Sequence, residues 1–375
     1  MTDNYIICKR CIMDTSDPGI EFDENGLCNR CRNYYVRIKS DLHYDEDGKQ
    51  KLNAMVDKIK RDGKNKEYDC IIGVSGGVDS TTVAYYVKRL GLRPLAIHVD
   101  NGWDPEFAIR NVEKILKVLN IDLRTYVLDW EVFKDLQLSF LKASVPNCEI
   151  PTDHAITALL YRTAAENKIP YIISGGNVVT EAIMGKWGYR HADYKHIKGI
   201  HKKFGSTSLK NYPHLNLFDW AYFTFVKGIK FIPILNYIRY VSKDAKELIT
   251  KELGWHDYGI KHFESIYTRF FQAYIQPTKF GFDKRKAHLS NLICSDQMTR
   301  EEAMEEMEHD PYPTKELLKE DKEYVIKKLG LTEEEFEELM SRPVEAHLDY
   351  PNNNFFYEKL DFIVKLAHKK ATHNE

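Results

Sequence analysis

The feature that most constrains the fold is an apolar run, residues 68–74, which ends in a glycine-rich loop and passes into a helical pattern up to Leu90. The loop consists of Ser75, Gly76, Gly77, Val78, Asp79 and Ser80. A loop that joins a buried strand to a helix N-terminus presents backbone N–H groups and the positive end of the helix dipole to an anion. These residues therefore predict a phosphate-binding loop at the carboxyl end of a strand.

Strand and helix patterns alternate after this loop. Apolar runs of strand length occupy residues 95–99, 123–128 and 171–174, and helical spacing occupies residues 105–119, 131–143 and 153–167. This alternation predicts an α/β fold class with a parallel sheet and right-handed crossovers. Ligands of such sheets bind beyond the carboxyl ends of the strands, where the glycine loop also lies.

The side chains of the loop indicate nucleotide phosphates with magnesium. Ser75 and Ser80 are able to donate hydroxyl hydrogen bonds to phosphate oxygens. Asp79 repels phosphate unless a cation lies between them, which suggests Mg²⁺, with Glu181 as a second candidate ligand. The loop lacks the lysine of the G-x-x-x-x-G-K-[ST] motif and does not follow G-x-G-x-x-G.

Two later strand ends carry further candidate nucleotide-binding residues. Val99 and Asp100 end the second predicted strand, and Gly175 and Asn177 lie in the turn after the strand at 171–174. A polar strand end and a plain turn are the alternative interpretations.

Four of the seven cysteines lie within the first 31 residues, as Cys8, Cys11, Cys28 and Cys31. Two C-x-x-C pairs at this separation predict a tetrahedral structural zinc site, because four thiolates close the coordination shell. An iron–sulfur cluster and a ribbon that has lost its metal are the alternatives.

The composition of the chain changes along its length in a way that predicts four parts. These are a zinc ribbon (1–35), a lysine-rich helical connector (36–66), the nucleotide-binding domain (67–212) and a mostly helical C-terminal region (213–375). The aromatic segment 218–240 is interpreted as a buried helical region, with a partner-docking surface as the alternative.

The charge balance disfavours nucleic acid and membrane. Lys and Arg number 54 against 56 Asp and Glu, for a net charge of −2, whereas nucleic-acid-binding proteins are usually basic. Lys227, Lys230 and Pro233 interrupt the most apolar segment, so no membrane span is expected. The N-terminus carries no apolar signal region, which predicts a cytoplasmic protein.

The sequence Ser-Gly-Gly-Val-Asp-Ser after a strand resembles the pyrophosphatase loop of the PP-loop ATP pyrophosphatases. This resemblance implies an adenine-nucleotide α-hydrolase-like fold in which the loop holds the β- and γ-phosphates of ATP. The α-phosphate is then attacked, which gives an adenylated substrate and pyrophosphate.

Over nearly the whole chain, the sequence resembles the N-acetyl sugar amidotransferases, the WbpG-like family with relatives in pseudaminic and legionaminic acid pathways. The resemblance rests on the cysteine ribbon with residues 13–15, the glycine loop, and the segments 151–156, 283–290 and 297–303. It implies that ATP and ammonia convert the acetamido group of a nucleotide-activated N-acetyl sugar to an acetamidino group, in lipopolysaccharide O-antigen synthesis. It further implies a partner glutaminase like that of histidine biosynthesis, with a cyclase-like barrel as a further candidate partner.

The resembling segments supply the remaining candidate catalytic residues. Lys284 and Arg285 are candidates to neutralise charge on pyrophosphate, as are Lys279 and Lys286, unless they form a solvated basic face. Asp153 is a candidate substrate ligand or a helix N-cap, and His154 a candidate acid/base. The basic, aromatic segment 186–203 is a candidate clamp for a sugar nucleotide, with a tRNA patch and a plain surface loop as alternatives.

Two other functions stay open at this stage. Thiolation of tRNA also uses zinc-ribbon PP-loop enzymes, but those carry further paired cysteines near ATP, whereas Cys70, Cys148 and Cys294 are isolated in this sequence. A nucleotide-binding subunit without turnover is the second. The sequence has no G-x-C-x-G nucleophile turn and begins Met-Thr, so ammonia is expected from outside the chain.

Overall fold

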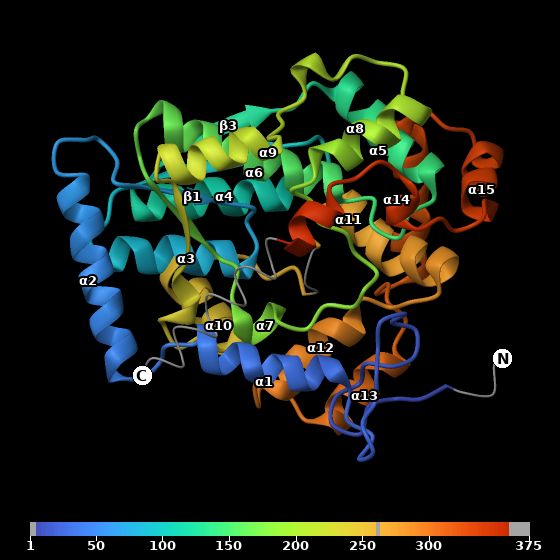
Figure 1. The fold of residues 1–375 in the computed structure, drawn as a ribbon, viewed down its shortest axis with the longest axis horizontal. Coiled ribbons are helices and arrows are strands. Elements are labelled where there is room, and N and C mark those ends of the chain that lie inside the picture. The colour runs from blue at the N-terminus through green and yellow to red at the C-terminus, as the bar shows by residue number, and fades with distance from the viewer. Residues whose placement is uncertain (1–4, 260–262, 360–375) are drawn as a thin grey trace.

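The computed structural model describes residues 5–259 and 263–359, built around one five-stranded parallel sheet (Figure 1). The strand order is β3-β2-β1-β4-β5. The strands are β1 (Cys70–Gly73), β2 (Pro94–Asp100), β3 (Asp122–Val127), β4 (Tyr171–Ser174) and β5 (Lys230–Pro233). The chain runs outward from β1 to β3 and then returns to the other side of β1, so the crossover direction reverses between β1 and β4. Ligands of open parallel sheets bind at such a switch point.

The sheet is covered on both faces, which explains why β1 is apolar throughout. Ile72 belongs to a core with α2 (Glu46–Asp62), α3 (Val78–Arg89) and α4 (Glu106–Leu119). Ile71 points to the other face and packs with Leu160 and Tyr161 of α6 (Ile150–Glu166). Alternate side chains of a strand point to opposite faces, so a strand buried on both sides has no polar positions.

The remaining helices complete this fold, which confirms the predicted parallel α/β domain with a cysteine ribbon and a helical C-terminal region. In the first two thirds of the chain they are α1 (Asn29–Asp41), α5 (Trp130–Ala143), α7 (Val178–Glu181), α8 (Tyr194–Phe204) and α9 (Leu217–Ala221). The C-terminal helices are α10 (Ser242–Leu253), α11 (Ile266–Phe270), α12 (Arg285–Cys294), α13 (Arg300–Glu308), α14 (Lys315–Leu329) and α15 (Glu333–Ser341). Helix α11 continues as a π-helix over Phe271–Phe280. Thr299 and Thr332 form capping boxes at the starts of α13 and α15.

The structure bears out only part of the interpretation of residues 218–240 as a buried helical region, because α9 and the π-helix Tyr222–Val226 that follows it are helical but exposed, and a strand comes after them. Strand β5 lies within this segment and pairs with β4, with Ile232 opposite Ile173, so the sheet extends beyond residue 212. The segment before β5 is exposed, because Phe218 and Phe225 retain 86% and 74% of their accessible surface. An edge strand tolerates lysine and proline, so residues 230–233 lack the apolar pattern by which a central strand is predicted.

The ribbon and the connector are integral to the fold. Residues 5–28 form tight turns with two isolated bridges, Ile7–Asp14 and Phe22–Cys28, instead of a regular β-ribbon. Helices α1 and α2 account for the predicted helical connector. In Figure 1 the dark blue ribbon lies beside α12 and α13. None of the described helices has the length and apolar character that crossing a membrane requires.

Candidate functional site

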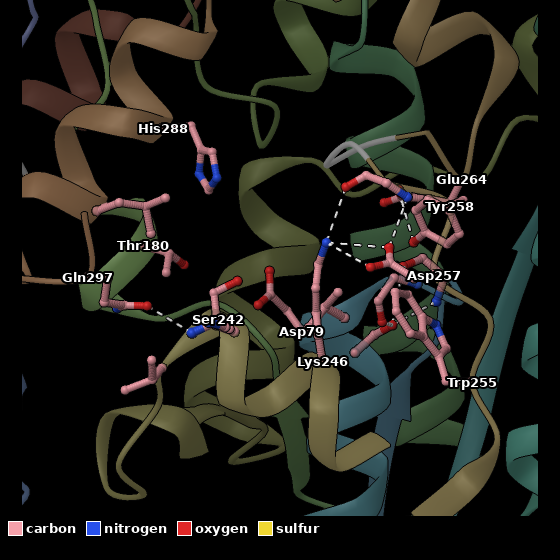
Figure 2. Close-up of a pocket in the computed structure, with 18 of the residues that line it drawn as sticks. Asp79, Thr180, Ser242, Lys246, Trp255, Asp257, Tyr258, Glu264, His288 and Gln297 are labelled. Atoms are coloured by element: carbon pink, nitrogen blue, oxygen red, sulfur yellow. Dashed lines mark hydrogen bonds and ion pairs between the residues drawn. The ribbon is translucent and has the colours of Figure 1, made fainter. Parts of the chain in front are cut away.

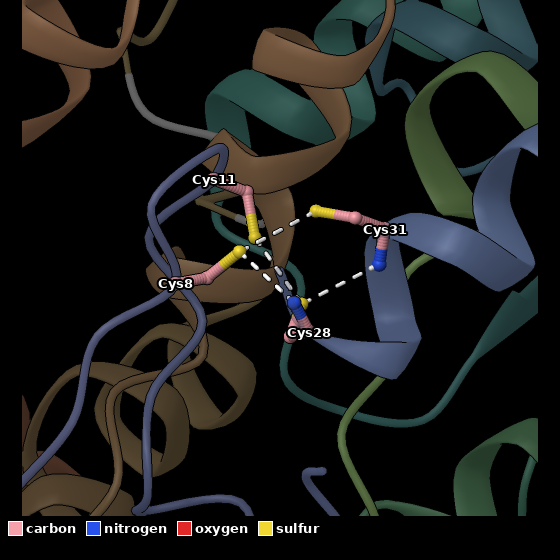
Figure 3. A group of neighbouring side chains, drawn as sticks. All are labelled: Cys8, Cys11, Cys28 and Cys31. Atoms are coloured by element: carbon pink, nitrogen blue, oxygen red, sulfur yellow. Dashed lines mark hydrogen bonds between the residues drawn. The ribbon is translucent and has the colours of Figure 1, made fainter. Parts of the chain in front are cut away.

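The four ribbon cysteines converge on one point (Figure 3). All four are buried, and their sulfur atoms lie within 4.8 Å of one another. Backbone N–H groups point at the sulfurs, including those of Met13 to Cys11 Sγ at 3.4 Å and of Cys28 to Cys8 Sγ at 3.3 Å. N–H donors stabilise thiolates, and four thiolates around one centre are the donor set of structural zinc. The residues present therefore fit zinc.

The ribbon is fastened to α12 and α13 by polar contacts. Lys286 forms an ion pair with buried Asp14, and the backbone N–H of Ile12 donates to Ser290 Oγ at 3.2 Å. Arg300 donates to the carbonyl oxygens of both Cys8 and Cys11, each at 3.3 Å. The metal centre is thus linked to α12, which also lines the cavities described below.

Cys294 is not isolated, contrary to the sequence-based expectation. It ends α12, and its Sγ lies 3.8 Å from Cys31 Sγ. The group of four sulfurs with metal-ligand spacing excludes it. Cys70 and Cys148 are buried in the protein core.

The glycine loop folds back on itself at the end of β1. Gly76 has a φ of +81°, a conformation that disfavours residues with a Cβ atom. Ser80 Oγ accepts the backbone N–H of Ser75 at 3.2 Å, and Ser75 Oγ accepts that of Gly77 at 3.3 Å. Helix α3 starts at Val78 after an N-cap glycine, and no described side chain caps it. Its first N–H groups are therefore available to an anion.

A cavity of about 450 Å³ opens over this loop (Figure 2). We call it the loop cavity. Its walls include Ser75, Gly77, Asp79, Lys246, Tyr258 and His288. The C-terminal half of the chain forms the wall that faces the loop, and in Figure 2 Asp79, Lys246 and His288 point toward the same space from different elements.

The facing wall is bound directly to the loop. Trp255 Nε1 donates to the carbonyl oxygen of Gly76 at 2.8 Å, and Tyr258 OH donates to the same oxygen at 3.4 Å. Lys246 Nζ donates to the carbonyl oxygen of Gly259 at 3.1 Å and lies 3.4 Å from the Asp257 carboxylate. The Asp257 contact fixes a cation at the cavity wall, where it is suited to bind phosphate.

The two candidate magnesium ligands lie around the turn after β4. Asp79 accepts a hydrogen bond from Tyr240 OH. A Cβ atom on Gly175 would lie 3.3 Å from the Asp79 backbone, and one on Gly176 would lie 3.5 Å from Glu181 Oε2. Burial raises the pKa of Tyr240, and the Asp79 and Glu181 charges add to the rise. Two carboxylates near one turn, beside a phosphate loop, fit Mg²⁺.

A second cavity of about 750 Å³ adjoins the first. We call it the large cavity. The two cavities share five lining residues: Thr180, Gly259, His288, Leu292 and Met298. Asp153, Glu181, Lys284 and Arg285 line the large cavity and are absent from the wall of the loop cavity. The arrangement provides two neighbouring compartments with a common wall.

The three predicted catalytic residues that line the large cavity, Asp153, Lys284 and Arg285, have different structural surroundings. Helix α6 begins at Ile150 with Glu149 as its N-cap residue, so Asp153 lies within the helix and is not its N-cap. Lys284 Nζ lies 3.9 Å from Glu149 Oε2. Arg285 is committed to structure, because it pairs with Asp283 at 2.7 Å and donates to the carbonyl oxygens of residues 306 and 309.

His154 does not have the acid/base role that the sequence suggested, because both of its ring nitrogens form hydrogen bonds with the backbone. Its Nδ1 lies 2.6 Å from the carbonyl oxygen of His191, and its Nε2 accepts the backbone N–H of Leu215 at 3.0 Å. Burial lowers the pKa of His154 to about 4, so the ring is neutral at pH 7. The neutral imidazole joins α6 to two loops and lines none of the cavities described here.

Val99, Asp100, Asn177 and Lys279 also differ from the predicted roles. Neither Val99 nor Asp100 lines the cavities described here, and Asp100 Oδ1 accepts the N–H of Gly102 at 2.8 Å. Asn177 caps α7 through Thr180. Lys279 Nζ donates to carbonyl oxygens at the end of α15. Gly175 lies beside Asp79 and lines none of the three cavities described here.

The basic segment 186–203 is mostly built into the fold. Trp187 stacks on Phe282 with ring centroids 4.5 Å apart and donates to the carbonyl oxygen of Ser16. His196 and His201 are buried in α8. Only His191 of this segment lines the large cavity.

Sequence reasoning missed the residues of the facing wall. Tyr240, Lys246, Trp255, Tyr258 and Glu264 are scattered through the C-terminal half and belong to no contiguous motif. The only sequence signal was a helical pattern over residues 243–253, which gave no indication that Lys246 faces the loop.

The parallel sheet and the glycine loop at its switch point define a PP-loop ATPase domain. Two family models match the sequence: that of QueC, a queuosine biosynthesis protein, over residues 69–201, and that of the C-terminal domain of WbpG-like LPS biosynthesis proteins over residues 264–365. The first match covers the loop, and the second covers α11 to α15 and most of the large cavity. The chain thus combines a PP-loop ATPase domain with a C-terminal region similar to that of WbpG-like proteins.

Two curated proteins resemble the chain over part of its length. The 7-cyano-7-deazaguanine synthase of Sulfurimonas denitrificans is 30% identical over 31% of this chain and 56% of the relative. The glutamine-hydrolysing GMP synthase of Pyrobaculum aerophilum is 34% identical over 29% of this chain and 20% of the relative. The chain therefore spans about half of one relative and one fifth of the other.

Solved structures with low overall similarity include three proteins. A predicted tRNA methyltransferase subunit of Methanocaldococcus jannaschii has 18% identity and a TM-score of 0.28, covering 48% of this chain and 75% of its own. The NH3-dependent NAD synthetase of Campylobacter jejuni has 20% identity and a TM-score of 0.28, and the match covers 41% of this chain and 72% of the synthetase chain. The NMN synthetase of Francisella tularensis has 16% identity and a TM-score of 0.29, and the match covers 58% of this chain and 98% of the synthetase chain. The fold assignment rests on the sheet order, the loop and the QueC match.

Proposed function

We propose that the chain is an ATP-dependent amidotransferase that converts the acetamido group of a nucleotide-activated N-acetyl sugar to an acetamidino group in surface polysaccharide synthesis. The observation that carries this proposal is the pair of adjoining cavities. The loop cavity suits ATP phosphates, and the large cavity is roomy enough for a second substrate. The WbpG-like match over most of the residues that line the large cavity supports a sugar acceptor.

In the proposed reaction, the acetamido oxygen attacks the α-phosphorus of ATP and pyrophosphate leaves. Ammonia then attacks the activated carbon, and AMP leaves with the former amide oxygen, so the product is a protonated amidine. An amide oxygen is a weak nucleophile, and holding it beside the α-phosphate supplies much of the rate. The shared wall around Thr180 and His288 is where the two substrates would meet.

Different residues of the loop cavity bind different parts of the ATP phosphate chain. The N–H groups at the start of α3 and the hydroxyls of Ser75 and Ser80 bind the β- and γ-phosphates, and Lys246 neutralises departing pyrophosphate. Mg²⁺ bound by Asp79 would neutralise further phosphate charge. Lys284 is suited to an anionic group of the acceptor, since it lines the large cavity.

The cysteine distribution favours nitrogen over sulfur transfer. Cys70, Cys148 and Cys294 are buried, and none of them lines the three cavities described in this article. A thiolation enzyme that carries sulfur on cysteine needs a thiol near the adenylated base. We therefore place tRNA thiolation second.

The ammonia source is proposed to be a partner glutaminase. The exposed aromatic side chains of the segment before β5, Phe218, Tyr222 and Phe225, form an apolar surface suited to such a partner. Its exposure supports the docking alternative for the segment 218–240.

The test supplies ATP, Mg²⁺, ammonium chloride and a panel of nucleotide-linked N-acetyl sugars. The expected products are AMP, pyrophosphate and an amidine of the sugar. Formation of ADP and phosphate, or of AMP without any dependence on the sugar, would contradict the proposal. Exchange of labelled pyrophosphate into ATP separates an active enzyme from a nucleotide-binding subunit.

A further inference from the structure

A third cavity, of about 490 Å³, lies at the carboxyl ends of β4 and β5, and the proposed roles of the other two cavities do not use it. We call it the α1 cavity, because Arg37, Ser40 and Asp41 of α1 form part of its lining. Arg37 and Ser40 are exposed, so this side is open to solvent. The inner side is lined by Ser174, Asn177 and Val178 at the end of β4.

A single turn of helix separates the α1 cavity from the other two. Val178 of α7 lines the α1 cavity, and Thr180 lines both the loop cavity and the large cavity. Glu181 ends this turn and lines the α1 cavity and the large cavity together. A small molecule that passes Glu181 therefore arrives beside the compartment proposed for the acceptor.

The lining of the α1 cavity suits a small cation. Asp41 and Glu181 contribute carboxylates, and the rings of His43 and Tyr237 lie in contact with centroids 4.8 Å apart. Phe231 of β5 adds a third ring to the lining. Carboxylates and aromatic faces both attract cations, and ammonium is small enough to use them together. A nucleotide is disfavoured, since Asn177 already caps α7 and the lining carries one arginine, Arg37, against two carboxylates.

We propose that the α1 cavity is the entry site of the nitrogen donor: ammonium collects between Asp41 and the rings of His43 and Tyr237, gives one proton to solvent at the open side of the cavity, and passes Glu181 as ammonia to the activated acceptor. This inference rests on the proposed function. It adds a third binding site to those for ATP and the acceptor. A partner that delivers ammonia would release it at this opening.

The test blocks the opening with Ser40→Trp in the full chain. The matched control is Val36→Trp, which places the same side chain on α1 at a position that is 66% exposed and outside the cavity lining. With ammonium chloride as donor, Ser40→Trp should raise the KM for ammonium at least tenfold and increase AMP release without amidine formation. Acceptor-dependent exchange of pyrophosphate into ATP should stay at the wild-type rate.

A second variant, Asp41→Asn, removes a charge without adding bulk and should raise the KM for ammonium several-fold. Equal ammonium KM values in wild type, Ser40→Trp and Asp41→Asn would overturn the proposal. A loss of exchange that matches the loss of amidine would also overturn it, since the substitutions would then act on adenylation. Wild-type protein without acceptor-dependent exchange would instead refute the proposed function.

Discussion

The two sides of the loop cavity differ in how the sequence specifies them. One side is six consecutive residues, Ser75 to Ser80, whose chemistry is local: glycines, hydroxyls and a helix start. The other side collects Lys246, Tyr258 and His288 from separate elements of the C-terminal half. The difference teaches that phosphate binding is encoded in a short motif, whereas the closure of the site depends on tertiary packing. The predictions below test this division, from the largest expected effect to the smallest.

The loop side should be the most sensitive to a single change. Asp79→Asn keeps the shape of the side chain and removes the charge that would hold Mg²⁺, so acceptor-dependent pyrophosphate formation should fall on the order of 10²- to 10³-fold. The measurement is kcat for pyrophosphate release at saturating ATP. Asp244→Asn, an exposed carboxylate on α10, is the control and should leave the rate unchanged. A normal rate in Asp79→Asn would remove the magnesium role.

Loss of the ribbon metal should disturb the cavities that α12 lines. Cys28→Ser breaks the four-sulfur set, so the purified protein should lose zinc and its melting temperature should fall. Because Lys286 ties the ribbon to α12 and Arg300 ties it to α13, the KM for the acceptor should also rise.

Cys294→Ser is the matched control for the metal, because it removes the neighbouring sulfur that lies outside the group of four. It should retain one zinc per chain by metal analysis. Wild-type protein that contains no zinc and still has a folded ribbon would contradict the ligand assignment.

A substitution in the facing wall should have an intermediate effect on ATP binding. Lys246→Met retains the length of the side chain and loses a charge-assisted contact to phosphate, which is worth about 1.5–3 kcal/mol. The KM for ATP should rise roughly tenfold to a hundredfold. Lys251→Met on the same helix lies outside the cavity and should match wild type. Identical KM values for both variants would show that the wall only encloses the site.

His154 should have the smallest effect on activity and a clear effect on acid stability. Its pKa is lowered to about 4 in the folded protein, against about 6.5 when unfolded, so its contribution is complete above pH 6.5 and is lost as the pH falls toward 4. This residue alone accounts for about 3 kcal/mol of that loss. His154→Gln should therefore flatten the decline in the free energy of unfolding, measured by urea denaturation at several pH values.

The exposed His309 provides the control for this pH dependence. His309→Gln should keep the wild-type slope and activity. If His154→Gln abolished pyrophosphate exchange while it stayed folded, an acid/base role would replace the structural one.

The sequence predicted the sheet, the loop and the cysteine cluster because each is local or periodic. The β1 run and the Ser75–Ser80 loop carry their own signals, and the C-x-x-C pairs set their own spacing. Strand β5 was missed because an edge strand with Lys230 and Pro233 lacks the apolar pattern of a central one. The role of His154 depends on partners 37 or more residues away, and that of Arg285 depends on carbonyl groups at the C-terminal end of α13. No residue pattern encodes such partners.

The most direct measurement follows the amide oxygen. A nucleotide-linked N-acetyl sugar carrying ¹⁸O in its acetamido carbonyl is incubated with the enzyme, ATP, Mg²⁺ and ammonium chloride, and AMP is analysed by mass spectrometry. If the two cavities bring the amide oxygen to the α-phosphorus, each AMP formed with an amidine should contain one ¹⁸O atom. Unlabelled AMP, or ADP in place of AMP, would contradict adenylation of the acceptor.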